Sequence, residues 1–196
     1  MATNHDRRAA LADAGIAVLA REGGRGLTHR AVDARSGSPV GTASNYFRDR
    51  AALLGALVDR IGERLAPDPL VLEELARLPR GRAAYAEYVR YIVARLTADP
   101  DVALALFELR LEAARRPEVG AVITAWQRQS FAADIAFNKA AGLPGGPREI
   151  ALFHYALDGL LLDRLTNPID PATPTDAVID QLVTAVFAAE TGPPTR

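Results

Sequence analysis

Apolar side chains recur along the chain at the spacing of a helix face rather than at the alternating spacing of a strand. In residues 4–21, for example, Leu11, Ala14 and Val18 lie three or four positions apart and therefore share one face of a helix. No convincing run of alternating apolar and polar residues interrupts this pattern. The pattern predicts an all-α fold of about nine helices.

Glycines, prolines and capping residues divide the pattern into short helices first and longer ones afterwards. Glycine often follows the last turn of a helix, and Ser38 followed by Pro39 suits a helix start, with serine as the N-cap. The expected helices, caps included, cover residues 4–21, 28–36, 38–47, 49–65, 81–98, 99–115, 117–141, 147–165 and 174–190. Three short helices within the first fifty residues, followed by long ones, are an unusual layout.

A tight turn around Ser36-Gly37 joins the second and third expected helices. Such a turn, often containing glycine, is typical of a helix-turn-helix, in which the second helix enters the major groove of DNA. The exposed positions of this second helix carry Thr42, Ser44, Asn45 and Tyr46. Their hydroxyl and amide groups suit base edges or phosphate oxygens, and none is acidic. A short capped helix with a polar face and no DNA contact would have the same composition.

The charge distribution supports a DNA-binding head only weakly. The chain of 196 residues has a net charge of -1, which taken alone argues against a nucleic-acid partner. Residues 1–50 hold eight arginines and five acidic residues, whereas the remaining residues hold 15 basic and 19 acidic side chains. Arginines that flank the helix pair and suit phosphate contacts are Arg30, Arg35, Arg48 and Arg50.

The composition argues against several classes of enzyme and cofactor protein. Without cysteine, the chain has no disulfide, thiolate metal site or cysteine nucleophile, and no histidine follows a glutamate at the spacing of di-iron proteins. Nucleophile elbows, phosphate loops and dinucleotide fingerprints are also missing from the sequence. We therefore expect no enzyme activity, no cofactor and no bound metal. The chain has no apolar run of about 18 residues and a poor signal peptide, so a cytoplasmic location is expected.

The first part of the chain resembles the DNA-binding domain of the TetR family of bacterial regulators. The similarity covers roughly residues 6–58, and glycines, caps, aromatic residues and core positions all fall in register. The matching residues are Gly26-Leu27-Thr28, Ala31-Val32, Ala34, Gly37, Gly41-Thr42, Asn45-Tyr46-Phe47, Ala51 and Leu53-Leu54. The resemblance implies a helix-turn-helix DNA-binding domain in residues 1–48 and a ligand-binding and dimerisation domain in residues 49–196. It also implies a homodimer on double-stranded DNA, at a palindromic operator, most commonly a repressor that a small molecule releases.

The resemblance also implies which residues meet DNA. The expected DNA-binding residues are Thr28, Arg30, Val40, Thr42, Ala43, Ser44, Asn45, Tyr46 and Arg50. Thr28 would also cap the second helix, and Arg50 stands where the family commonly has a lysine. Two positions depart from the family, because Val40 stands where lysine is frequent and Ser44 where tyrosine is frequent. A smaller and less basic surface should lower non-specific affinity and change the preferred operator.

Aromatic side chains mark the larger expected domain. Tyr85, Tyr88 and Tyr91 recur every three residues and, with other aromatics, suit a pocket that is mostly apolar with a few hydroxyl groups. The residues expected to bind a largely apolar small-molecule effector are Tyr88, Tyr91, Phe107 and Trp126. Each of these side chains would alternatively fill the protein core.

The last two expected helices, about 147–165 and 174–190, are apolar on more than one side. Two such helices suit a four-helix interface between the subunits of a homodimer, which is also the arrangement of the family. They would alternatively pack only within one protomer. Two other functions remain beside a DNA-binding regulator: a helical ligand-binding adaptor that has lost specific DNA binding, and a helical enzyme.

Overall fold

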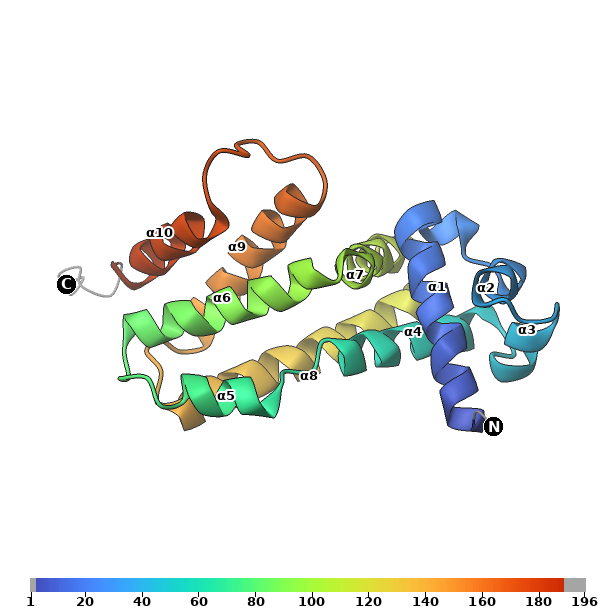
Figure 1. The fold of residues 1–196 in the computed structure, drawn as a ribbon, viewed down its shortest axis with the longest axis horizontal. Coiled ribbons are helices and arrows are strands. Elements are labelled where there is room, and N and C mark those ends of the chain that lie inside the picture. The colour runs from blue at the N-terminus through green and yellow to red at the C-terminus, as the bar shows by residue number, and fades with distance from the viewer. Residues whose placement is uncertain (1–2, 189–196) are drawn as a thin grey trace. The chain divides into compact units, whose positions relative to one another are not determined.

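The computed structural model describes residues 3–188, and this range contains ten helices and no strand. The expectation of an all-α fold is therefore confirmed. The chain forms two compact units (Figure 1), of which unit 1 holds the residues up to Ala66 together with Asp99–Gln127, and unit 2 holds the rest. Among the described helices, none is long and apolar enough to cross a membrane. The boundary expected between the DNA-binding and ligand-binding domains, after residue 48, does not coincide with the division into units. The assignment of these two functional domains stays a prediction.

Unit 1 is built around the first helix. Its helices are α1 (Asn4–Gly26), α2 (His29–Ser36), α3 (Thr42–Tyr46), α4 (Arg50–Arg64), α7 (Pro100–Ala113) and the first part of α8 (Pro117–Ala141). Helix α1 packs against α2, α4 and α7. One continuous apolar core joins these helices, and it includes Ile16, Leu19, Leu27, Phe47, Leu57, Leu109 and Ile123. The short N-terminal helices therefore share their core with α7 and α8.

Helix α1 is capped by Thr3, one residue before the expected cap at Asn4, and it bends at Gly23. Thr3 accepts a hydrogen bond from the Asp6 N–H, and the Asp6 carboxylate accepts one from the Thr3 N–H, so the two residues form a capping box. The expected end at Gly23 is a kink with φ of 68°, after which a further helical stretch runs to Gly26. A left-handed φ suits glycine because it has no Cβ atom.

Helix α2 matches its expected range, whereas α3 is shorter than expected. Thr28 caps α2 by accepting a hydrogen bond from the Ala31 N–H at 3.1 Å. The prediction that Ser38 and Pro39 begin the third helix is wrong, because α3 begins only at Thr42. Gly41 precedes it with φ of 95°, a left-handed conformation that interrupts any helix begun earlier.

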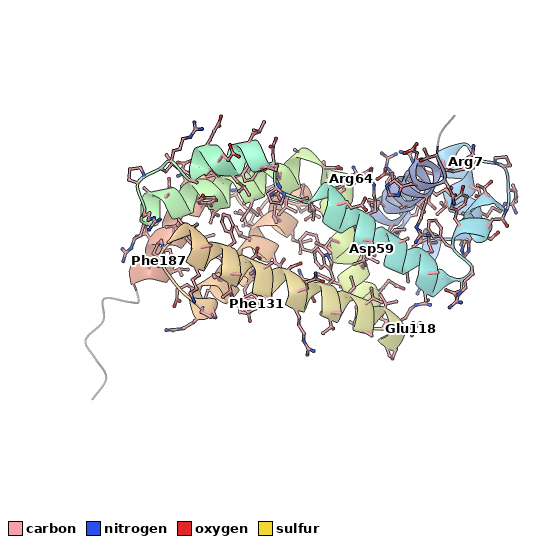
Figure 2. The ribbon with its side chains drawn as sticks, turned by 90° about the horizontal axis from the view of Figure 1, so that it is seen from below. Arg7, Asp59, Arg64, Glu118, Phe131 and Phe187 are labelled. Carbon is pink, nitrogen blue, oxygen red and sulfur yellow. The ribbon has the colours of Figure 1, made fainter. Side chains whose placement is uncertain are left out.

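Unit 2 contains α5 (Pro69–Leu75), α6 (Arg82–Ala98), the rest of α8, α9 (Pro147–Leu165) and α10 (Thr175–Ala188). Helix α10 packs on α6 and α9. Phe187 lies in the last turn of α10 (Figure 2). Its carbonyl accepts a hydrogen bond from Arg82. The rings of Tyr85, Phe153 and Phe187 form one buried cluster, with centroids 4.7–5.9 Å apart.

The additional helix α5 and the end of α10 mark where the expected helices and the structure differ in unit 2. Helix α5 was not expected; it is short and has no fully buried residue, although Val71, Leu72 and Leu75 share one half-buried face. The sequence does carry a local signal for the start of α5, namely Asp68 followed by Pro69. The Asp68 carboxylate caps the helix by accepting a hydrogen bond from the Leu70 N–H. The expected end of the last helix at residue 190 lies outside the described residues.

Replacement of Leu57 by alanine should destabilise unit 1. Leu57 is fully buried, and its side chain lies so close to Gly15 that a Cβ atom there would be 2.9 Å away. We expect Leu57→Ala to lower the free energy of unfolding by about 3 kcal/mol, because a cavity replaces close packing. Urea unfolding followed by circular dichroism at one protein concentration measures this change. Leu70→Ala is the control, since Leu70 is 69% exposed and should lose little; equal losses would contradict the packing described here.

Candidate DNA-binding interface

The predicted DNA-binding residues fall into three groups by exposure. Exposed side chains are those of Thr28, Arg30, Val40, Ser44 and Asn45, and half-buried ones are those of Thr42, Tyr46 and Arg50. Ala43 is fully buried in the core of unit 1, so its side chain packs against protein and offers no surface to a ligand. Val40 lies just before α3 and is 83% exposed.

A buried carboxylate holds the turn and α3 together. Asp33 of α2 is almost inaccessible to solvent, and its two oxygens accept hydrogen bonds from the backbone N–H groups of Gly41 (2.7 Å) and Ala43 (2.6 Å). The Asp33 carbonyl also accepts the Ser38 N–H at 2.9 Å. Because Gly41 has no side chain to cap α3, Asp33 satisfies the first turn of α3 from the neighbouring helix.

Sequence reasoning missed Asp33. The available signal was an acidic residue in the middle of the short helix α2, next to the buried Val32 and just before a turn. An aspartate at such a place is rarely buried without partners, so N–H groups beyond the turn were the obvious candidates. Asp33 is a positioning residue for α3.

The hydroxyl groups of α3 donate to the backbone of their own turn. Thr42 Oγ1 donates to the Pro39 carbonyl at 2.6 Å, and Ser44 Oγ donates to the Gly41 carbonyl at 2.9 Å. Each hydroxyl oxygen still has lone pairs that accept hydrogen bonds. In this conformation the two hydroxyls suit donors such as the amino groups of adenine or cytosine better than they suit phosphate oxygens.

The end of α3 is held by α1 and α2. The Tyr46 carbonyl accepts a hydrogen bond from Arg8 Nη1 at 3.3 Å, and the Arg8 guanidinium lies 4.9 Å from the centroid of the Phe47 ring. His29 Nε2 donates a hydrogen bond to the Phe47 carbonyl oxygen at 2.6 Å. The Tyr46 side chain also packs partly on the core of unit 1. These contacts fix the end of α3, and Asp33 fixes its start.

Arg50, at the start of α4, is engaged with the protein. Its guanidinium donates to the carbonyls of Gly24 and Leu27, and its Nη2 lies 3.7 Å from Glu112 Oε2. The preceding residue, Asp49, caps α4 by accepting the Ala52 N–H at 2.8 Å, and this hydrogen bond lowers the pKa of its carboxyl group. The structure thus places Arg50 between α7 and Leu27-Thr28, the two residues that join α1 to α2 (the α1–α2 link).

The residues expected to bind a ligand belong to both units. In unit 2, Tyr88 is buried and makes an edge contact with Phe137 at 5.3 Å, and the Tyr91 hydroxyl accepts the Asp68 N–H at 2.7 Å. In unit 1, Trp126 packs against the core and Phe107 is half-buried. The ligand-binding role of these side chains stays a prediction.

Comparisons with known proteins identify relatives of the chain. The family model described as tetracyclin repressor-like, C-terminal domain, matches residues 80–189. The solved structure of the multidrug binding protein EbrR with imidazole is 27% identical, with 92% of this chain and 94% of that chain covered and a TM-score of 0.64. A TetR family member from Streptomyces coelicolor A3 is 25% identical, with 92% and 98% covered and a TM-score of 0.69. A transcriptional regulator from Rhodococcus sp. Rha1 is 21% identical, with 95% and 99% covered and a TM-score of 0.68. No curated protein matches the chain.

Replacement of Asp33 by alanine should loosen the turn and α3. Two buried N–H groups would lose their acceptor, so we expect Asp33→Ala to lower the free energy of unfolding by about 3 kcal/mol. Urea unfolding at one protein concentration measures the loss. Asp59→Ala is the matched control, since Asp59 is an exposed aspartate within a helix, α4 (Figure 2). If the two variants were equally stable, the Asp33 carboxylate would not hold α3.

Proposed function

Because the chain belongs to the TetR family of transcriptional regulators, we propose that it is a homodimeric repressor that binds a palindromic operator and leaves it when a small molecule binds. Residues 1–48 read the DNA, and residues 49–196 bind the effector and hold the dimer together. The observation that carries this proposal is the α2–turn–α3 segment, in which Asp33 fixes α3 while Ser44 and Asn45 stay exposed.

The exposed side chains of this segment suit recognition of double-stranded DNA. Ser44 and Asn45 reach base edges in the major groove, where an asparagine pairs well with adenine. Thr28, Arg30 and the other exposed arginines near the turn bind phosphates and set the register on the duplex. Val40, where relatives commonly have lysine, supplies an apolar contact that suits a thymine methyl group rather than a phosphate.

The exposed face of α9 supports a homodimer. Leu152, Tyr155 and Leu162 lie on one face of this helix and are at least 40% exposed, and Tyr155 reaches 71%. Gly159 continues the same stripe, and a Cβ atom there would meet no other atom of the protomer. A contiguous apolar stripe marks an interaction surface. A second copy that covers this stripe with its own α9 and α10 would form a four-helix interface.

Dimerisation supplies both the affinity and the switch. A single helix-turn-helix buries too little surface for tight specific binding, whereas two heads held one DNA turn apart bind two half-sites together. An effector that binds better to dimers with the wrong head separation weakens DNA binding by that difference in affinity.

The effector in this proposal is a small, largely apolar molecule, and its candidate contacts within unit 2 are Tyr88 and Tyr91. The aromatic character of these side chains supports this assignment, since apolar surfaces with a few hydroxyl groups are typical of small-molecule sites. The relative EbrR, described as a multidrug binding protein, was solved with imidazole. A ligand of comparable size and aromatic character is therefore the first to test.

Gel-shift titration with the DNA that flanks the gene of this protein tests the proposal, and Tyr46 provides the decisive variant. We expect Tyr46→Ala to weaken operator binding by about tenfold to a hundredfold, because a contact made by the recognition helix is lost. Gel filtration should show that the dimer persists.

Tyr46→Phe is the matched variant, since it keeps the ring that packs on the core and removes only the hydroxyl group. A loss with both variants assigns a DNA contact to the hydroxyl, whereas a loss with alanine alone assigns the effect to the ring and its packing on the core. Unchanged affinity in both would remove Tyr46 from the interface. Wild-type protein without salt-sensitive binding to any flanking palindrome would favour the adaptor function instead.

A charged residue in the α9 stripe should separate the subunits. We expect Tyr155→Arg to yield monomers at concentrations at which the wild type is dimeric, because two like charges would meet across a symmetric interface. Light scattering after gel filtration measures the mass. Ile169→Arg is the control, because Ile169 is 93% exposed but lies outside α9 and α10. A dimeric Tyr155→Arg protein would place the interface elsewhere.

A further inference from the structure

A buried glutamate of α7 lies among three arginines within unit 1. The Glu112 side chain is only 7% exposed, and its carboxylate lies 3.0 Å from Arg116 Nε, 3.5 Å from Arg115 Nη1 and 3.7 Å from Arg50 Nη2. Arg115 and Arg116 follow Glu112 closely in the chain, whereas Arg50 comes from α4. Removal of a carboxylate from water is costly unless charged partners compensate, so this cluster requires the arginines.

Arg50 connects this glutamate to the link between α1 and α2. Its two terminal nitrogens donate to the carbonyl of Gly24, in the last turn of α1, and to that of Leu27, in the link itself. Arginine suits this position because its planar fork binds several acceptors in fixed directions, which lysine does not. The Arg50 guanidinium thereby ties the residues just before α2 to α4.

The backbone of Gly24 makes room for Glu112. A Cβ atom at Gly24 would lie 2.5 Å from Glu112 Cδ, so any side chain at this position would displace the Glu112 carboxylate. The absence of a side chain at Gly24 and the position of Arg50 are separate observations. The first places α7 against the last turn of α1, and the second connects α7 to the α1–α2 link.

General cohesion of α1 and α7 does not require Glu112. The two helices already share the buried core of unit 1, and Arg21 and Asp101 form an exposed ion pair between them at 3.4 Å. Within the described residues, neither Glu112 Oε2 nor Arg50 Nε has a hydrogen-bond partner of normal geometry. Arg50 Nη2 and Glu112 Oε2, at 3.7 Å, form an ion pair without a hydrogen bond between them.

We propose that Glu112 is a positioning residue for DNA binding: through Arg50 it fixes the α1–α2 link, and thereby the orientation of α2 and α3. This inference rests on the proposed function, since it assigns regulation to the same DNA-binding segment. A displacement of α7 would move Glu112 and release Arg50 from the carbonyls of Gly24 and Leu27. Arg50 then acts on DNA through the protein rather than by holding a phosphate.

The two possible roles of Arg50 predict opposite changes in DNA affinity for the Glu112→Gln variant. If Arg50 serves the link, loss of the Glu112 charge weakens DNA binding. If Arg50 grips a phosphate, Glu112 competes for it, and its neutralisation tightens binding. We expect Glu112→Gln to bind the flanking DNA about tenfold more weakly than wild type. The slope of log affinity against log salt should stay unchanged, because no phosphate contact is lost.

Asp101→Asn is the matched control, since it removes an ion pair between the same two helices at the surface. It should leave the affinity unchanged. Equal or tighter binding by Glu112→Gln, or a salt slope reduced by about one, would overturn the inference. Failure of the wild type to bind any flanking DNA would instead remove the proposed function.

Hydrogen exchange tests the positioning role without DNA. We expect Glu112→Gln to raise amide exchange in residues 24–33 more than Asp101→Asn does, with little change in α4. Arg50→Lys should produce the same local increase while it keeps the charge, and it replaces Glu112→Gln if that variant unfolds. Exchange that rises uniformly over unit 1, or does not rise in residues 24–33, would show that Glu112 only stabilises the fold.

Discussion

The arrangement of the DNA-binding segment depends on the two hydrogen bonds that the buried Asp33 carboxylate accepts from Gly41 and Ala43. Helix α3 is too short to be stable alone, and its N-cap is a glycine that cannot cap it with a side chain. A charged acceptor on α2 satisfies its first N–H groups and matches the positive end of its dipole. The same contact fixes the angle between the two helices, so stability and recognition geometry have one origin.

This arrangement explains which helix starts could be predicted well from the sequence. Thr28 and Asp49 cap their helices with their own side chains, and a local pattern is sufficient to find them. The start of α3 depends instead on Asp33, which lies eight residues before Gly41 and acts through the turn. Ser38 followed by Pro39 has the local pattern of a helix start, but the non-local carboxylate and the left-handed Gly41 place that start later.

The candidate site shows the same limit of local reasoning. The exposed Ser44 and Asn45 were predictable from a helix with a polar face, because exposure follows from the pattern. The engagement of Arg50 was not, since it depends on carbonyls of Gly24 and Leu27 and on a glutamate in α7. In the sequence, an arginine near a DNA-binding helix is equally compatible with phosphate contact and with an internal tie.

The shared core of unit 1 has a consequence for regulation. Because Leu27 and Phe47 are buried in the same core as Leu109 of α7 and Ile123 of α8, the DNA-binding segment has no apolar core of its own. Packed cores switch between discrete arrangements rather than deform continuously, so a shift of α7 should move the segment as a whole. The ion pair between Glu112 and Arg50 then determines where this coupling acts, because it connects α7 to the α1–α2 link rather than to α3 itself. Side chains of α3 that face DNA can therefore be exchanged without altering the contact between Glu112 and Arg50, because none of them takes part in it.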